Sequence, residues 1–534
     1  ELGVWASSPF LAVILRLFDG FFHIFLPSLL LCRCLTYIQL WMAPVALGTV
    51  FLSKQPLISM LFKPQRLSRP YTFKPPRSQQ FWEALYKMEL LLNFSVPILC
   101  YIVRAQSWLM YSVTLFTGLV VMTLQVLRSI MLPKIRSAAA TIMQRLLQHG
   151  EIQVLSPSTV PRNQQQWDIV VQNPAFWLDW MSDGLVAIGE SFVSGQWEVN
   201  PNGEKSLDAI VVRLLTLPIE ARREMYQSWY ARFVSLAARI FNYPSSSAGL
   251  IVGPVSEMYD VGAGFQRHYY EVTYFYHGFG MWLSDRDTLL EAQERTLHMI
   301  AEKLQLQPGD HVLDLNLASC GGVGCFLARF YQVHVDSIVS SEADRIIALQ
   351  LAQSAGLTDQ IQFIVVEPGK DIAQMLNQLL SKRYQAITAG QVIEITPEIE
   401  LPRLLYLMKD KLSQNGRLVL DFVASPARPN THAWSNKHIV PHQPYFPVSY
   451  TTVKNALVAV DWTILEAHSY ADHYDKTYLA WYNAFQSVWP SIFQGKLPES
   501  FRRTWEFYLL HTAACYRARK LQGYQVTLRS SISD

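Results

Sequence analysis

The carboxy-terminal half of this 534-residue chain is predicted to fold as an α/β domain, with a parallel sheet covered by helices on both faces. Two observations predict this class. Short apolar stretches alternate with amphipathic ones from Leu289 onward, and turn residues such as Pro308, Gly309 and Asp310 separate them. Ligands of such sheets bind at the carboxyl ends of the strands, so a functional site is expected there.

The elements of this sheet follow in chain order. Leu297, Ile300 and Leu304 recur at helical spacing, which predicts an amphipathic helix before the first strand. Strands are predicted at residues 312–315, 333–339, 361–366, 386–389 and 417–423, with helices at 324–331, 343–355, 372–380 and 401–412.

The stretch 311–325 has the setting of a nucleotide-binding turn between a strand and a helix, but its glycines stand in unusual places. Glycines in such turns let the main chain approach a ligand closely and aim N–H groups at it. Residues 316–319 contain no glycine where the tight turn should begin, and Gly321, Gly322 and Gly324 come late. We therefore expect the fold to be kept and the ligand site to be altered.

The composition favours a protein that meets a membrane. Charged residues make up only 16% of the chain and the mean hydropathy is +0.11, which is apolar for a chain long enough for two or three domains. A net charge of +3 gives no reason to expect nucleic acid as a partner. The six cysteines lack zinc-site spacing and are interpreted as reduced, buried thiols: Cys32, Cys34, Cys100, Cys320, Cys325 and Cys515.

The first third of the chain holds the candidate membrane segments. Residues 105–127 carry no charge and could cross a hydrocarbon core of about 30 Å as a helix. Residues 34–53 form a second uncharged run, and the segments 11–32 and 90–103 could be interfacial, tilted or re-entrant. The alternative is a buried helical subdomain of a soluble protein.

Changes in sequence character predict three regions. Residues 1–146 form a membrane-anchoring helical region, 147–248 a small lipid-binding domain, and 249–534 the α/β domain with a carboxy-terminal extension. The small polar stretch 244–248 marks the second boundary. Asn173 is predicted to cap a helix that runs to Asp183.

Several motifs resemble the cyclopropane-fatty-acyl-phospholipid synthases and the related mycolic acid methyltransferases. The resemblance covers about residues 152–530 and leaves the first 150 unmatched. It rests on GESFVSGQWE (189–198), YDVG (259–262), the helix 287–304, and above all ADHYDKTYLAWYNAF (471–485) with the segments 501–508, 516–519 and 525–526. The resemblance implies an S-adenosylmethionine-methyltransferase-like Rossmann sheet with a small helical domain.

The family is described as transferring the methyl group of S-adenosylmethionine to a cis double bond of a phospholipid acyl chain, where a base then removes a proton to close a ring. That base is thought to be bicarbonate, held by Cys, Glu, His, Ile and Tyr. Carried over, the Glu is Glu394 and the Tyr is Tyr474. The Cys, His and Ile positions hold Gly278, Asp421 and Val423, and Ile395 replaces the His that follows the family's Glu.

These substitutions predict a degenerate site. An ionised Asp421 would place a like charge beside Glu394 and would repel an anion, and Gly278 offers no thiol. The cofactor positions implied by the resemblance are Asp314 and Glu342, with Gly321, Gly322 and Gly324 serving as the glycines if the insertion in the turn bulges. His277 and His473 are interpreted as satisfied polar residues, and no metal site is expected.

The first hypothesis is therefore a membrane-anchored, catalytically degenerate member that acts as a structural or lipid-binding subunit, without cofactor, beside other integral membrane subunits. The mitochondrial inner membrane is one candidate location. The second hypothesis is an active lipid methyltransferase that uses S-adenosylmethionine, and a soluble dehydrogenase on the same sheet is the third and least supported. Phospholipid and membrane are expected partners under both of the first two hypotheses.

Overall fold

The computed structural model describes residues 108–155, 167–203, 205–241, 265, 267–270, 273–366, 372–378, 382–425, 433–439 and 448–530. The candidate membrane segments 11–32, 34–53 and 90–103, the linker 244–248 and the motif 259–262 lie outside these residues.

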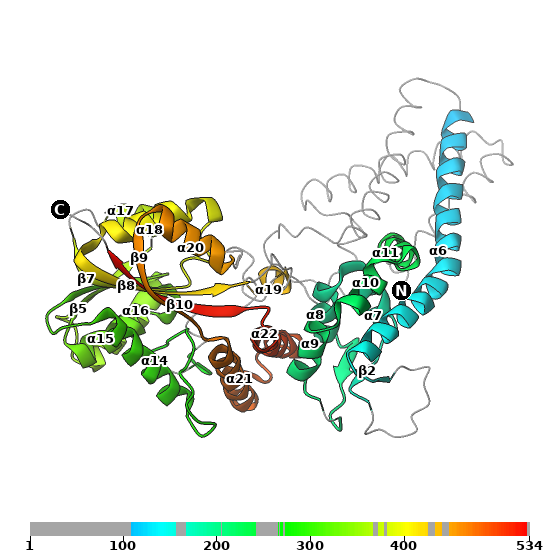
Figure 1. The fold of residues 1–534 in the computed structure, drawn as a ribbon. Coiled ribbons are helices and arrows are strands. Elements are labelled where there is room, and N and C mark those ends of the chain that lie inside the picture. The colour runs from blue at the N-terminus through cyan, green and yellow to red at the C-terminus, as the bar shows by residue number, and fades with distance from the viewer. Residues whose placement is uncertain are drawn as a thin grey trace, which may run out of the picture.

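The carboxy-terminal half is built on a seven-stranded sheet with strand order β6-β5-β4-β7-β8-β10-β9 (Figure 1). Five neighbouring strands are parallel, as predicted: β4 (His311–Asn316), β5 (His334–Val339), β6 (Ile361–Val365), β7 (Tyr384–Gly390) and β8 (Leu412–Ala424). Two strands that the sequence analysis did not identify extend the sheet in an antiparallel manner. They are β9 (Trp462–Ser469) and β10 (Gln522–Ser530), with β10 between β8 and β9. The sheet is therefore mixed.

Helices cover both faces of the sheet because side chains alternate along each strand. Val312 of β4 packs into one apolar cluster, whereas its neighbours Leu313 and Leu315 pack into the other. The first cluster includes α14 (Leu289–Leu304), α15 (Gly322–Tyr331) and α16 (Glu342–Ser354). The second includes α17 (Ile372–Gln378), α18 (Leu401–Asp410) and α20 (Tyr450–Ala459). The predicted helices are thereby confirmed.

Local sequence fixes where these helices begin. Thr288 and Glu291 form a capping box at the start of α14, in which each side chain accepts the main-chain N–H of the other residue. Ser341 caps α16 by accepting the N–H of Asp344. In the amino-terminal part, Asn173 accepts the N–H of Ala175 just before α7 (Ala175–Asp183), but Pro174 rather than Asn173 occupies the N-cap position, one residue later than predicted.

The helical region before the sheet shares one apolar core with the last two helices of the chain, α21 (Ala471–Val488) and α22 (Glu499–Arg517). Figure 1 shows α22 beside this region. Trp177, Ile210 and Trp505 belong to the same buried cluster. Besides α7, the elements are α6 (Trp108–His149), α8 (Leu185–Val193), α9 (Leu207–Leu215), α10 (Ile219–Gln227) and α11 (Trp229–Phe241), with the small sheet β1 (Val154–Leu155), β2 (Ile169–Val171) and β3 (Trp197–Val199).

Two motifs that carried the family resemblance meet at this junction. Arg503 of α22 donates to the carbonyl groups of Phe192 and Trp197, at 2.8 and 3.2 Å. The guanidinium group also lies over the Phe192 ring, 4.4 Å from its centre. Gly189 lets α8 approach Trp434, because a Cβ at this position would lie 2.4 Å from the indole nitrogen. These contacts hold the helical region against the rest of the chain.

Residues 108–127 of the predicted membrane span 105–127 form the first part of α6. Within the described ranges, no helix combines the length and the apolarity that crossing a membrane requires, so this predicted transmembrane region is left without support. Of the six cysteines, Cys320, Cys325 and Cys515 are described, and each is a buried free thiol, as expected.

Glu190 links α8 to the short helix α19 (Ala433–His438) through Lys437 and His438. Burial alone would raise the pKa of Glu190, but the hydrogen bond from His438 and the charge of Lys437 outweigh it and lower this pKa to about 2. A carboxyl group with a lowered pKa contributes stability above its unfolded pKa and loses that contribution as the pH falls through its folded pKa.

The substitution Glu190→Gln should lower the free energy of unfolding by about 2 kcal/mol at neutral pH, because it removes the charge that Lys437 and His438 share. The loss should shrink as the pH falls from about 4.5 toward 2, where the native carboxylate is protonated as well. Urea unfolding measures both. The matched control is Glu151→Gln, which removes an exposed ion pair with Arg213 and should change the free energy of unfolding much less than Glu190→Gln does. Equal losses in the two variants would contradict this role of Glu190.

Candidate active site

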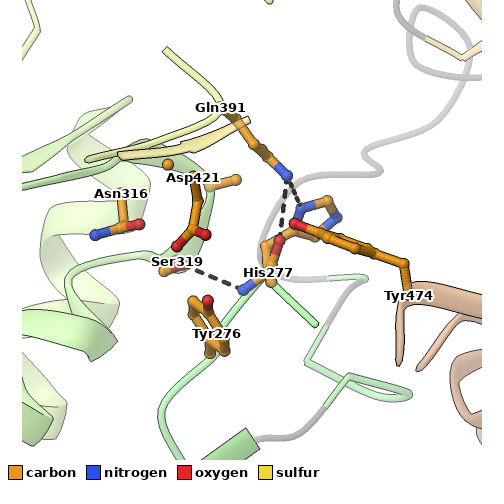
Figure 2. A pocket seen from close by; sticks show the side chains of 10 residues that line it. Tyr276, His277, Asn316, Ser319, Gln391, Asp421 and Tyr474 are labelled. Atoms are coloured by element: carbon orange, nitrogen blue, oxygen red, sulfur yellow. Dashed lines mark hydrogen bonds between the residues drawn. The ribbon is translucent and has the colours of Figure 1, made fainter. Parts of the chain in front are cut away.

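A pocket lies at the carboxyl ends of β4, β7 and β8, where the parallel sheet was expected to carry a site (Figure 2). Its walls are the segment 276–278, the turn after β4, the end of β7 with Gln391, Asp421 of β8, and Tyr474 of α21. The free volume among these side chains is about 10 Å³, enough for about one water molecule. The pocket is therefore nearly filled by its own side chains.

The turn after β4 is organised by the buried carboxylate of Asp314. This group accepts the main-chain and side-chain N–H groups of Asn316 at 3.0 and 2.8 Å, the hydroxyl of Ser337 at 2.8 Å, and the N–H of Gly324 at 3.0 Å. The chain then forms a 3₁₀ turn at Leu317–Ser319 before α15 begins at Gly322. Burial raises the pKa of Asp314, and the four hydrogen bonds oppose this effect.

The late glycines of the turn are packed against the protein itself. A Cβ on Gly322 would lie 1.5 Å from the carbonyl oxygen of Tyr274, and one on Gly321 would lie 2.5 Å from the Phe363 ring. The space beside Gly324 is taken by Ile361 and Val335 of neighbouring strands. The late glycines therefore serve close packing on the sides that the structure describes, and their role as the glycines of a cofactor turn stays a prediction.

The substitution Gly322→Ala should destabilise the protein by more than about 2 kcal/mol, because the added methyl group meets main-chain atoms of Tyr274 that no side-chain rotation can move. Thermal or urea unfolding tests this expectation. Gly150→Ala is the control, since its nearest atoms are side-chain carbons at 3.1 Å and beyond, and its change should stay within about 1 kcal/mol. A stable Gly322→Ala protein would mean that Tyr274 does not cover the turn.

Asp421 is buried, 5% exposed, at the pocket end of β8. The amide of Gln525 approaches its Oδ2 at 3.5 Å, and its Oδ1 has no hydrogen-bond partner among the described residues. Burial raises the pKa of Asp421 to about 7, against the hydrogen bond from Gln525 and the charge of Lys303. The expectation of an ionised Asp421 repelled by Glu394 is therefore corrected: burial governs its charge, which changes near neutral pH.

Gly278 stands where the family has cysteine, and it makes room for Tyr276. A Cβ at position 278 would lie 2.1 Å from the Tyr276 ring, so the side chain of a cysteine and the present position of this ring exclude each other. The Tyr276 hydroxyl points toward Asp421 and has no partner among the described residues (Figure 2). The absence of a side chain at position 278 therefore leaves room for a buried phenol.

Glu394 and Tyr474, the two retained family positions, are both buried. The Oε1 atom of Glu394 accepts the main-chain N–H of Val423 at 2.6 Å. The contact uses the main chain of Val423, so it does not depend on which side chain replaces the family's Ile. Tyr474 lines the pocket and stacks on Tyr516 with ring centres 4.8 Å apart. The structure therefore brings Gly278, Asp421 and Tyr474 together at the pocket. Glu394 is hydrogen-bonded to β8, the strand that carries Asp421.

Glu342 lies elsewhere. It begins α16, is exposed to solvent, and forms an ion pair with Arg345 one turn later. It does not line the pocket, and its role as a cofactor position remains a prediction.

Sequence reasoning did not place Tyr276 or Gln391 in the pocket, and it named His277 only as a satisfied polar residue. Tyr276 and His277 stand next to Gly278, and Gln391 precedes Glu394 by one turn. The Nε2 of Gln391 donates to the His277 carbonyl at 3.1 Å, and Ser319 accepts the His277 N–H at 3.2 Å (Figure 2). Burial lowers the pKa of His277 to about 4. His277 is thus a neutral, hydrogen-bonded residue, as interpreted from sequence. Tyr276 and Gln391 could have been identified from the sequence because they are polar residues close to Gly278 and Glu394.

The substitution Asp421→Asn should change how stability depends on pH. A carboxyl group whose folded pKa is raised favours the folded state while protonated and costs stability as the pH rises through about 7. Between about pH 5 and pH 8 the unchanged protein should lose roughly 2 kcal/mol more than the variant, as measured by urea unfolding. The control Asp285→Asn removes an exposed carboxylate whose pKa is lowered by Lys476. This variant should lose as much stability between these pH values as the unchanged protein does. Parallel curves for Asp421→Asn and the unchanged protein would show that Asp421 titrates normally.

Comparison with known proteins shows what this chain is similar to. The family model described as mycolic acid cyclopropane synthetase matches residues 252–526. Cyclopropane-fatty-acyl-phospholipid synthase of Escherichia coli is 27% identical over 370 residues, which are 69% of this chain and 89% of that protein. Tuberculostearic acid methyltransferase UfaA1 of Mycobacterium tuberculosis is 23% identical over 245 residues, 45% of this chain and 55% of that one. The solved cyclopropane synthase MmaA2 of the same organism has a TM-score of 0.45 at 19% identity, covering 52% and 99% of the two chains.

The mixed sheet, its helices on both faces and the pocket at the strand ends define an α/β protein with an S-adenosylmethionine-methyltransferase-like fold. The family model spans just over half of the residues. The chain belongs to the mycolic acid cyclopropane synthetase family, which confirms the resemblance seen in the sequence.

Proposed function

We propose that the protein transfers a methyl group from S-adenosylmethionine to an unsaturated acyl chain of a lipid, with a donor site that differs from the family pattern. The family assignment and the printed activities of the relatives support the reaction class. The single observation that carries the proposal is the pocket itself. A buried carboxyl group and two tyrosine rings converge there, at the strand ends where this fold places its ligand.

The chemistry of the pocket residues fits the sulfonium end of this donor. Cations of this kind are stabilised by carboxylate groups and by the faces of aromatic rings, which Asp421, Tyr276 and Tyr474 provide. Asn316 and Gln391 add amide groups that can hold polar parts of the same molecule. When bound, S-adenosylmethionine supplies an electrophilic methyl group.

The remaining residues position and dry the site. Glu394 fixes the end of β8 through the N–H of Val423, two residues beyond Asp421. The stacking of Tyr474 on Tyr516 holds one wall in place. The free volume is about that of one water, so the site holds little solvent, which would protect a reactive cation on a lipid bound beside it from hydrolysis until a base removes the proton. Phospholipid, and a membrane that contains it, are the partners that follow from this proposal.

A second candidate is the catalytically degenerate, lipid-binding or structural subunit of a membrane assembly. One specific observation favours it: the side of Gly322 that faces Tyr274 is already occupied, so this glycine offers no open face there to a nucleoside. In that case the carboxylate of Asp314 maintains the turn for the fold alone.

The two candidates differ in whether the donor binds and reacts. Calorimetry with S-adenosylmethionine should give micromolar affinity, and incubation with a trideuteromethyl donor and vesicles of unsaturated phospholipid should label the acyl chains, as measured by mass spectrometry. Glu394→Gln should lower the labelling rate by about tenfold or more, because the main-chain contact to Val423 weakens.

Glu398→Gln is the matched control, because Glu398 is an exposed carboxylate just after Glu394 in the chain, and labelling should not change. Absence of donor binding by the folded protein, together with unlabelled lipid, would reject the proposed reaction in favour of the degenerate subunit.

A further inference from the structure

The pocket contains a buried charge without a matching countercharge. Asp421 is the one side chain of its lining that ionises near neutral pH, because burial raises the pKa values of Tyr276 and Tyr474 and lowers that of His277. Its Oδ1 atom has no partner among the described residues. A buried carboxyl oxygen that no protein group satisfies costs stability, and such a group marks a site where a ligand completes the contacts.

The nearest cation acts on Asp421 from a distance and is already paired. Lys303 of α14 donates to the Gln525 side chain at 2.6 Å and forms an ion pair with Glu466 of β9 at 2.8 Å. Gln525 therefore stands between Lys303 and Asp421, and its amide reaches Asp421 only at 3.5 Å. The contact that is missing from Asp421 is on the pocket side.

Aromatic rings surround the open side of this carboxyl group. Tyr276 points its hydroxyl toward Asp421, and Tyr474 lies across the pocket (Figure 2). The negative charge of Asp421 raises the pKa values of both tyrosines further, in addition to the effect of burial. A carboxylate beside tyrosine rings suits a cation that carries alkyl groups, because such a cation loses little hydration on entry and interacts with ring faces as well as with the charge.

We propose that Asp421 makes this pocket selective for alkylated cations, so that it binds the positively charged methyl donor and rejects its neutral thioether product. The sulfonium group of the donor and the quaternary ammonium group of a choline phospholipid share this chemistry. The proposal that the pocket binds the methyl donor rests on the proposed function, whereas binding of a choline headgroup would not require that function. Either cation enters by displacing the Tyr276 ring, whose hydroxyl gives up no hydrogen bond to the described residues in moving.

The selectivity depends on pH through Asp421. Among the described residues, the groups whose charges act on Asp421 or respond to it are Lys303 of α14, Tyr276 of the segment before α14 and Tyr474 of α21. The charge of Glu394 acts on Tyr474, Lys303 is paired with Glu466, and His277 lines the same pocket. Cation affinity should rise as the pH increases through about 7, because the ionised carboxylate is the binding form. Affinity for a neutral ligand should not follow this curve.

Calorimetry with four probes tests the proposal on the full chain: S-adenosylmethionine, sinefungin with its cationic amine, S-adenosylhomocysteine without a charge at that position, and phosphocholine. The unchanged protein should bind sinefungin about tenfold more tightly than S-adenosylhomocysteine near pH 8, and the ratio should fall near pH 6. Asp421→Asn should abolish the ratio by weakening the cationic probes alone. The control Asp285→Asn makes the same change in net charge at the surface and should keep the ratio.

The outcomes separate this inference from the proposed function. Nucleoside binding with an equal ratio in the unchanged protein and in Asp421→Asn would overturn the role of Asp421 and leave the methyl-transfer proposal standing. Binding of phosphocholine alone, lost in Asp421→Asn, would keep the cation site and reject the methyl donor as its ligand. If the folded protein binds none of the four probes, both proposals fail. Circular dichroism of each variant shows whether it is folded.

Discussion

The four hydrogen bonds to the Asp314 carboxylate are the constraint on which the site depends. They connect β4, β5, the turn and the first turn of α15, so one buried group sets the path of the chain at the mouth of the sheet. With this path fixed, Gly322 packs against the main chain of Tyr274. Tyr276 and His277, which follow Tyr274 in the chain, line the pocket. The four hydrogen bonds thus hold the turn in one conformation, although residues 316–319 contain no glycine.

Asp421 shows how burial changes the meaning of a substitution. A carboxyl group in place of the family's His looks destructive if it is assumed to be ionised at all times. In the dry end of β8 its proton is held near neutral pH, and Lys303 moderates the effect from behind Gln525. The same burial that makes this residue a cost to the fold gives it a charge that a ligand can use.

The parallel strands and their helices could be predicted because apolar runs and helical spacing directly record which faces are buried. β9 and β10 were missed because antiparallel additions beyond the last crossover have no such rhythm, and β9 is only partly buried. Gly278, Asp421 and Tyr474 could be assigned to one site through family motifs. The packing of Tyr276 over Gly278, the Gln391 bridge and the exposed position of Glu342 could not, because they depend on tertiary contacts between distant segments and on the local Arg345 pair.

The shared core between the amino-terminal helices and α21 and α22 has a consequence for the evolution of this chain. Trp177 and Ile210 lie in one buried cluster with Trp505, which is more than half the sequence away from each of them, so the helical region and the last helices of this chain are packed as one unit. Gene fusions or losses that divide the chain at about residue 248 would expose the apolar sides of both halves to water. Because the helical region and the carboxy-terminal segment share this core, each limits which substitutions the other can accept.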